Sequence, residues 1–380
     1  MHTRTWILGV ALGLSLGACG KKKDEPGPPP PPTTTPPPAP GANPTTPGTP
    51  GTPPPPPVTR LSQGALQKMP ALALPDDPAR DAKVALGHAL FFDKRMSVDG
   101  TRACYSCHLN EDGLGGHDPI AIGPGDKKLT RHSPALWNLG YHKTGFYWDG
   151  RAATLEDVAK GAWGGGNMAV GKDNLEKKAA EIGKIKGYAP LWKAAFADAP
   201  ASADQVAQAL AAYMRTITCT DTAYDKFAAG DKTALDEAQQ RGLDVFMGKG
   251  ACTACHTPPT FTISSMMEGG AFFNTGIGTV GKPDAEIDAG RGGITQKPED
   301  WAAFKVPSLR GVSKSPPYFH DGSMAKLEDA VRFMATGGQP NKNLTALMSN
   351  KNLSDPELAD LVAFLGGLEC KTLLTEPKLP

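Results

Sequence analysis

Apolar residues recur with helical spacing in two segments that occupy equivalent places in the two halves of the chain. Val84, Leu86 and Leu90 form one face of a predicted helix at 79–92, and a similar face predicts a helix at 234–247. Further amphipathic helices are predicted at 155–160, 174–182, 188–196, 203–217, 326–334 and 355–368. Since no segment alternates convincingly in the way of a strand, the pattern predicts an all-α fold.

Each of the two equivalent helices is followed by a short loop and the sequence C-x-x-C-H, the signature of covalent c-type haem attachment. Two thiols at this spacing can both reach the vinyl groups of one porphyrin, and the adjoining histidine then becomes a ligand of the iron. The motifs predict two haems. One is held by Cys104 and Cys107 with His108 as ligand, and the other by Cys252 and Cys255 with His256 as ligand.

The alternatives for these motifs are a zinc site and a thioredoxin-like redox pair. Zinc would need a second Cys or His pair close to each motif, and neither motif has one. A thioredoxin-like redox pair lies in a βαβ context, which this sequence lacks. Helix, loop and motif together resemble the small all-helical cytochrome c domain, present twice. We therefore expect haem domains at 61–225 and 226–380 with long loops, among them a Gly-rich segment at 269–293 around the second haem.

The first eighteen residues have the features of an export signal. Arg4 is followed by an apolar segment that is too short to span a bilayer permanently. Leu16-Gly17-Ala18-Cys19 resembles a bacterial lipobox, so Cys19 is predicted to be lipidated; the alternative is an ordinary signal peptide with a chance cysteine. Gly20 at the next position favours an outer-membrane anchor facing the periplasm.

Residues 19–60 contain the lipidated cysteine and a Pro/Thr/Gly-rich segment with two unbroken proline runs, Pro28–Pro32 and Pro53–Pro57. Such a segment cannot bury a core and favours extended polyproline conformations. It is predicted to be a disordered linker that holds the haem domains away from the membrane. A ligand for a proline-binding module is the less favoured interpretation.

Net charge and cysteine content bear on the class of partner and on disulfide bonding. The formal net charge of +1 gives no reason to expect nucleic acid as a partner. Of seven cysteines, five are assigned to lipid and haem, and Cys219 and Cys370 are left over. In an oxidising compartment, two leftover cysteines predict a disulfide bond.

Several stretches carry a more specific resemblance. They are Leu90-Phe91-Phe92-Asp93-Lys94-Arg95, Phe146-Tyr147-Trp148-Asp149-Gly150-Arg151-Ala152, Asn274-Thr275-Gly276, Lys305-Val306-Pro307-Ser308-Leu309-Arg310 and Tyr318-Phe319-His320-Asp321-Gly322. With the two haem motifs, their order resembles that of the bacterial di-haem cytochrome c peroxidases and their relative MauG, which matures a tryptophan-derived quinone cofactor. The resemblance covers nearly everything from 80 to 370.

This resemblance implies different functions for the two haems. Hydrogen peroxide would be reduced at the haem of His108, and the haem of His256 would receive electrons from a cytochrome c or a cupredoxin. Met334 matches the family's sixth ligand of the second haem, with Met324, Met266 and Met267 as rivals. Trp148 matches an indole that the family places between the haems, as an electron relay.

The sequence departs from the peroxidase pattern on the distal side of the first haem. Pro124 replaces the histidine that blocks the iron in the classical peroxidases, as a proline does in MauG, so the iron is expected to be open. The family's acid–base glutamate is absent from Asn167–Gly171, which would weaken turnover. His117 and Glu156 are candidate stand-ins, and His117 is also an alternative iron ligand.

The resemblance also suggests a bound calcium ion and a dimer. His132 replaces the family's calcium-binding Asn, a poor exchange since calcium prefers oxygen, although the carbonyls of Ser315 and Pro317 are candidate ligands. Dimerisation of the haem domains is left open. The leading hypothesis is a lipid-anchored peroxidase of the cell envelope, and the rivals are a MauG-like oxidase of a partner protein and a non-enzymatic di-haem electron carrier.

Overall fold

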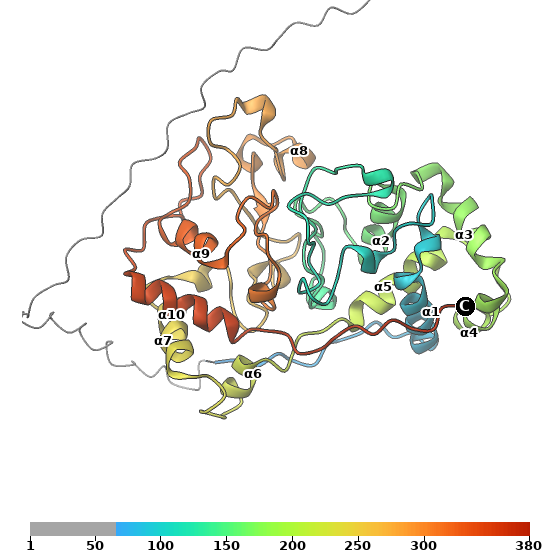
Figure 1. Ribbon diagram of the computed structural model, residues 1–380, viewed down its shortest axis with the longest axis horizontal. Coiled ribbons are helices and arrows are strands. Elements are labelled where there is room, and N and C mark those ends of the chain that lie inside the picture. The colour runs from blue at the N-terminus through green and yellow to red at the C-terminus, as the bar shows by residue number, and fades with distance from the viewer. Residues whose placement is uncertain (1–65) are drawn as a thin grey trace, which may run out of the picture. The chain divides into compact units, whose positions relative to one another are not determined.

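The computed structural model describes residues 66–380, which are predominantly helical (Figure 1). The one sheet within these residues is the antiparallel pair β1 (Phe272–Phe273) and β2 (Phe304–Lys305). The helices are α1 Arg80–Phe92, α2 Leu155–Gly164, α3 Leu175–Gly183, α4 Ala189–Phe196, α5 Ala203–Thr216, α6 Ala223–Ala228, α7 Glu237–Met247, α8 Gly292–Thr295, α9 Leu327–Ala335 and α10 Asp355–Gly366. All eight predicted helices are confirmed, and α6 and α8 are additional.

Several helices begin at a reciprocal capping box, in which a Ser, Thr or Asp side chain accepts from a backbone N–H three residues on, while the side chain at that position accepts from the cap. These boxes satisfy backbone donors that a helix start leaves without partners. They are formed by Thr154 and Asp157, Ser202 and Gln205, Thr222 and Asp225, Asp236 and Gln239, and Ser354 and Glu357.

The buried apolar side chains form two cores, and each contains a close helix crossing at a glycine. In the first core, a Cβ on Gly87 of α1 would collide with the carbonyl of Ala209 in α5. In the second, a Cβ on Gly242 of α7 would collide with the carbonyl of Asp360 in α10. Only glycine permits this backbone approach, so both halves use the same packing device.

Three extended segments connect the two cores, and they run between them in Figure 1. The segment before α1 starts with Leu66 in the second core, and the Pro70 carbonyl then accepts from Tyr141 in the first half. Residues 217–222 link α5 to α6. The last segment leaves α10 and returns to the first half, where Leu374 and Leu379 pack against the first core.

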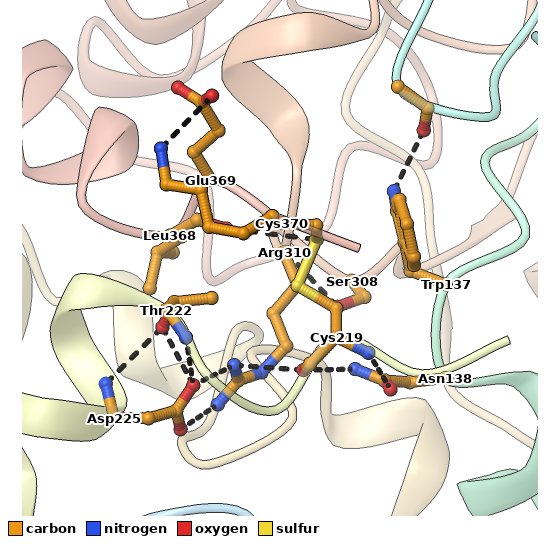
Figure 2. Close-up of a disulfide and its surroundings, with 12 residues drawn as sticks. Trp137, Asn138, Cys219, Thr222, Asp225, Ser308, Arg310, Leu368, Glu369 and Cys370 are labelled. Carbon is orange, nitrogen blue, oxygen red and sulfur yellow. Dashed lines mark hydrogen bonds and ion pairs between the residues drawn. A yellow bond between two sulfur atoms is a disulfide. The ribbon is translucent and has the colours of Figure 1, made fainter. Parts of the chain in front are cut away.

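A disulfide bond joins the second of these segments to the third, through Cys219 and Cys370. Asn138 of the first half binds the backbone of Cys219 through two hydrogen bonds. Its side-chain amide donates to the Cys219 carbonyl at 3.1 Å and accepts from the Cys219 N–H at 2.8 Å. Figure 2 shows the disulfide beside the buried ion pair of Arg310 and Asp225. The leftover cysteines thus lie where both halves meet.

Candidate functional site

The first C-x-x-C-H motif folds as a tight turn that starts from an anchored residue. The Ala103 N–H donates to Ser106 Oγ at 2.9 Å, and the Cys104 carbonyl accepts from the N–H of His108 at 3.2 Å. The turn therefore places His108 about one helical turn after Cys104. Both cysteine thiols of the motif are unpaired and half-buried.

The imidazole of His108 is held ready to bind a metal. Its Nδ1 donates to the carbonyl of Leu114 at 2.8 Å, which leaves the lone pair on Nε2. Burial lowers the pKa of His108 to about 4, so the ring is neutral at pH 7. A neutral ring oriented by a backbone carbonyl is the usual form of a histidine ligand.

The second motif repeats this geometry. The His256 N–H donates to the Cys252 carbonyl at 2.8 Å, and its Nδ1 donates to the carbonyl of Phe261 at 3.2 Å. Burial lowers the pKa of His256 to about 4. Cys252 and Cys255 are likewise unpaired and half-buried.

A cavity of about 280 Å³ adjoins the first motif. Cys104, Cys107 and His108 line it, together with many apolar and aromatic side chains such as Phe91, Phe146, Trp163, Met168 and Leu210. Unpaired thiols, a neutral imidazole and an apolar wall are what a covalently attached haem requires. The residues of the first motif therefore fit a c-type haem.

Trp148 lines the same cavity and is held by backbone from both halves. Its indole Nε1 donates to the carbonyl of His132 at 2.8 Å, and its own carbonyl accepts from the N–H of Lys305 at 2.7 Å. The His132 N–H in turn donates to the carbonyl of His320 at 2.7 Å. The indole is thus fixed at the junction of the two halves.

Pro124 is buried at the start of a turn at Pro124–Asp126, and it does not itself line the cavity. Its neighbour Gly123 packs directly against the carbonyl of Gly166. The next two residues, Asn167 and Met168, do line the cavity. The Pro124 loop therefore supports the part of the cavity wall to which the resemblance assigns the family's glutamate, and an open iron beside it remains a prediction.

Neither candidate stand-in for that glutamate reaches the cavity. Glu156 lies outside the lining and binds Arg215 through both carboxylate oxygens, at 2.9 and 3.1 Å. The side chain of His117 is 80% exposed and contacts Asp112 at 3.3 Å. The structure supports neither as a proton donor, and the exposed position of His117 also argues against iron ligation.

Met334 lies in the last turn of α9 and is half-buried, while its neighbours Val331 and Ala335 belong to the second core. Met324 is also half-buried, and its backbone pairs with Tyr318. Met266 and Met267 are 57% and 45% exposed. Ligation by Met334 remains a prediction.

The candidate calcium ligands lie at the cavity. Ser315 and Pro317 line it, and the His132 imidazole Nδ1 donates to the Asp118 carbonyl at 3.0 Å. Within residues 66–380, no group of three or more His, Cys, Asp or Glu side chains is arranged to hold a metal ion. Carbonyl ligation by Ser315 and Pro317 remains a prediction.

Sequence reasoning did not identify the charged groups of this site. Arg131 of the first half binds Asp149 and also Asp288, from the Gly-rich segment, at 2.6 Å each. Arg291 donates to the carbonyls of Asp149 and Gly150. The Gly-rich segment therefore contacts the first half, and only the position of Asp149 within a family stretch could have drawn attention to this cluster.

Known proteins show clear similarity to this chain. The sequence model of the di-haem cytochrome c peroxidase family matches residues 81–233. Methylamine utilization protein MauG of Methylorubrum extorquens is 36% identical over 312 residues, which cover 80% of this chain and 83% of the relative. Cytochrome c551 peroxidase of Pseudomonas aeruginosa is 34% identical over 316 residues, which cover 81% and 84%.

Solved structures of MauG-like and diheme proteins are similar to this chain in fold. A MauG-like protein associated with microbial copper homeostasis has a TM-score of 0.73 and 29% identity, and the match covers 82% of this chain and 96% of that one. The diheme peroxidase BthA of Burkholderia thailandensis shares the fold, with a TM-score of 0.62, 20% identity and coverage of 85% and 94%.

Proposed function

Since this chain belongs to the family of di-haem cytochrome c peroxidases and MauG, we propose that it reduces hydrogen peroxide to water with electrons from a small redox protein. The observation that carries the proposal is the cavity that brings Cys104, Cys107 and His108 together with Trp148. A haem bound there would supply a redox-active iron that can accept peroxide. A cytochrome c or a cupredoxin is the electron donor that we propose.

In this proposal, each residue of the site has a separate task. Cys104 and Cys107 attach one porphyrin, and Cys252 and Cys255 attach the other. The neutral rings of His108 and His256 each offer a lone pair, because a backbone carbonyl holds the opposite nitrogen as a donor. Trp148 occupies an electron-relay position, which its backbone contacts with both halves support.

We further propose two cytochrome c-like domains at 61–225 and 226–380, preceded by a disordered linker. The two cores and the matched glycine crossings at Gly87 and Gly242 support two similar domains. Leu66 and the segment after Cys370 pack against the opposite core in each case. The domains are therefore interleaved at their ends.

The direct test is steady-state turnover of the di-haem protein with reduced cytochrome c and hydrogen peroxide. We expect peroxide-dependent oxidation of the cytochrome, and loss of that activity in His108→Ala. Lys297→Gln, which alters an exposed lysine, serves as the control and should retain activity. A protein with both haems attached that shows no turnover with any small donor would refute the peroxidase assignment.

Replacing Met334 with Ala is expected to lower the reduction potential of the second haem, because a thioether ligand raises it. The shift should be a substantial part of the roughly 0.8 V range that axial ligands set. Met324→Ala is the matched control, since Met324 is the nearest rival. Spectroelectrochemical titration measures both. An unchanged potential in Met334→Ala, or a shift in Met324→Ala alone, would exclude Met334 as ligand.

A MauG-like oxidase is the second candidate. The similarity to MauG and the proline at position 124 favour it, whereas Met334 speaks against it because MauG has a tyrosine as the ligand at that place. A mass shift on a partner protein after peroxide treatment would identify this activity. A non-enzymatic electron carrier, in turn, would show two low-spin haems, so a high-spin signal in the oxidised protein argues against it.

We also propose that the protein is anchored in the bacterial outer membrane through a lipid on Cys19 and faces the periplasm. Cys19, the export signal and the linker lie outside the described residues. The Cys219–Cys370 disulfide supports an oxidising compartment. None of the described helices is long and apolar enough to cross a membrane. Calcium binding at Ser315 and Pro317 and homodimer formation also remain predictions.

A further inference from the structure

The cavity at the first motif has an unbalanced charge. Four cationic side chains line it, namely Arg131, Arg151, Lys305 and Arg310. Within the described range 66–380, no aspartate or glutamate contributes to the lining. A cavity with this wall favours a bound molecule that carries negative charge.

Three of these four cations already have carboxylate partners outside the cavity lining. Arg131 binds Asp149 and Asp288, Arg151 binds Asp149 at 2.8 Å, and Arg310 binds Asp225 at 2.7 Å. Lys305 differs, because no carboxylate of the described residues lies within 4.0 Å of its ammonium group. The remaining positive charge of the cavity is therefore concentrated at Lys305.

The backbone of Lys305 is held rigidly beside Trp148. Lys305 belongs to β2, where it pairs with Phe272 of β1, and its N–H donates to the Trp148 carbonyl at 2.7 Å. Burial lowers the pKa of Lys305 to about 8, so most of the side chain is still charged at pH 7. Lys305 is half-buried, so its ammonium group is partly removed from water and is stabilised when a counter-ion binds it.

A second polar group without a partner lies in the same cavity. His142 is half-buried, and its buried Nδ1 has no hydrogen-bond partner within the described residues. Burial, and secondarily the charge of Lys305, lower the pKa of His142 to about 3, and both side chains line the same cavity. A neutral imidazole can donate one hydrogen bond to an oxygen that Lys305 also binds.

We propose that Lys305 and His142 form a carboxylate-binding site for a propionate group of the porphyrin attached at Cys104 and Cys107. The ammonium group supplies the counter-charge and the imidazole one further donor. The inference rests on the haem attachment in the proposed function, but it does not depend on peroxide turnover. It also assigns a purpose to the one cavity cation to which residues 66–380 supply no carboxylate.

The test compares di-haem Lys305→Gln with Lys305→Arg and with Lys297→Gln, which removes the charge of an exposed lysine from the same half. The readouts are the propionate bending band in resonance Raman spectra and the reduction potential of the first haem. We expect Lys305→Gln to shift the band and lower the potential, Lys305→Arg to stay close to wild type, and Lys297→Gln to change neither. If Lys305→Gln does not accumulate with both haems, His142→Gln should shift the same band.

Three outcomes would overturn the proposal. The first is an unchanged band and potential in a folded Lys305→Gln protein. The second is a change confined to the haem of His256. The third is a wild-type first-haem potential that follows added chloride or acetate, which would identify an exchangeable anion instead of a propionate. Because none of these measurements uses peroxide, failure of the peroxidase assignment would be recognised separately.

Discussion

Removal of the Cys219–Cys370 disulfide is expected to lower the free energy of unfolding by up to about 5 kcal/mol. The two cysteines are 151 residues apart, so the bond closes a long loop and strongly restricts the unfolded chain. In the folded protein, Asn138 already holds Cys219 in place through two hydrogen bonds, so the native geometry should survive without the bond. The main effect is therefore expected in the unfolded state.

Urea denaturation of the di-haem protein with and without reductant measures this effect. The double variant Cys219→Ser/Cys370→Ser should match the reduced wild type and should not respond to reductant. In the proposed di-haem protein the four motif cysteines would be bonded to porphyrin as thioethers, so reductant would not act on them. Equal denaturation midpoints for oxidised and reduced wild type would contradict the prediction.

Replacing Asp225 with Asn is expected to destabilise the fold by about 3–5 kcal/mol, because it leaves the Arg310 guanidinium buried without a counter-charge. The Arg310 side chain is fully buried and binds both carboxylate oxygens of Asp225, at 2.7 and 2.8 Å. Its other hydrogen bonds go to the carbonyls of Pro259 and Cys219. None of these neutral acceptors can replace the lost charge.

The same ion pair predicts how stability depends on pH. Burial opposes ionisation of Asp225, but hydrogen bonds from Arg310 and Thr222 outweigh it, and the pKa is lowered below its ordinary value of 3.8. A lowered pKa contributes stability that is fully present above the unfolded value and is lost as the pH falls through the folded value. The difference between wild type and Asp225→Asn should thus persist at pH 7 and 5 and shrink below about pH 3.8.

Thermal or urea unfolding at pH 7, 5 and 3 tests both statements. Asp198→Asn is the matched control, because Asp198 forms an ion pair with Lys193 in which both side chains are exposed, 85% and 74%. Exposed pairs of this kind contribute little to stability. A loss in Asp225→Asn no greater than in the control would show that the buried pair has little influence on the fold.

Helical periodicity was sufficient for the long helices but not for the short elements. The box of Thr222 and Asp225 could have revealed α6, since this spacing is a recognised helix start. No comparable signal exists for α8, whose sequence is Gly292-Gly293-Ile294-Thr295. Strands of two residues, such as β1 and β2, are too short to show any alternation.

The candidate site could likewise be predicted from the sequence only in part. The thiols and histidines that are predicted to bind haem lie within five-residue motifs, so their local geometry follows from the sequence. The charges of the cavity do not, because Asp288 and Lys305 reach Arg131 and Trp148 from far along the chain. Whether a buried cation has a partner is decided by tertiary packing, so the contrast between Lys305 and the three arginines could be seen only in the structure.

The segment that follows Cys370 also constrains the order in which the protein can fold. Asn110, two positions beyond His108, exchanges hydrogen bonds of 2.8 and 2.9 Å with the backbone of Leu374, and His88 Nε2 pairs with the Thr375 carbonyl at 2.7 Å. The ribosome makes these partners of the first motif only after the entire second core. The half that is synthesised first must therefore stay incomplete until the other is finished, which departs from the usual domain-by-domain order.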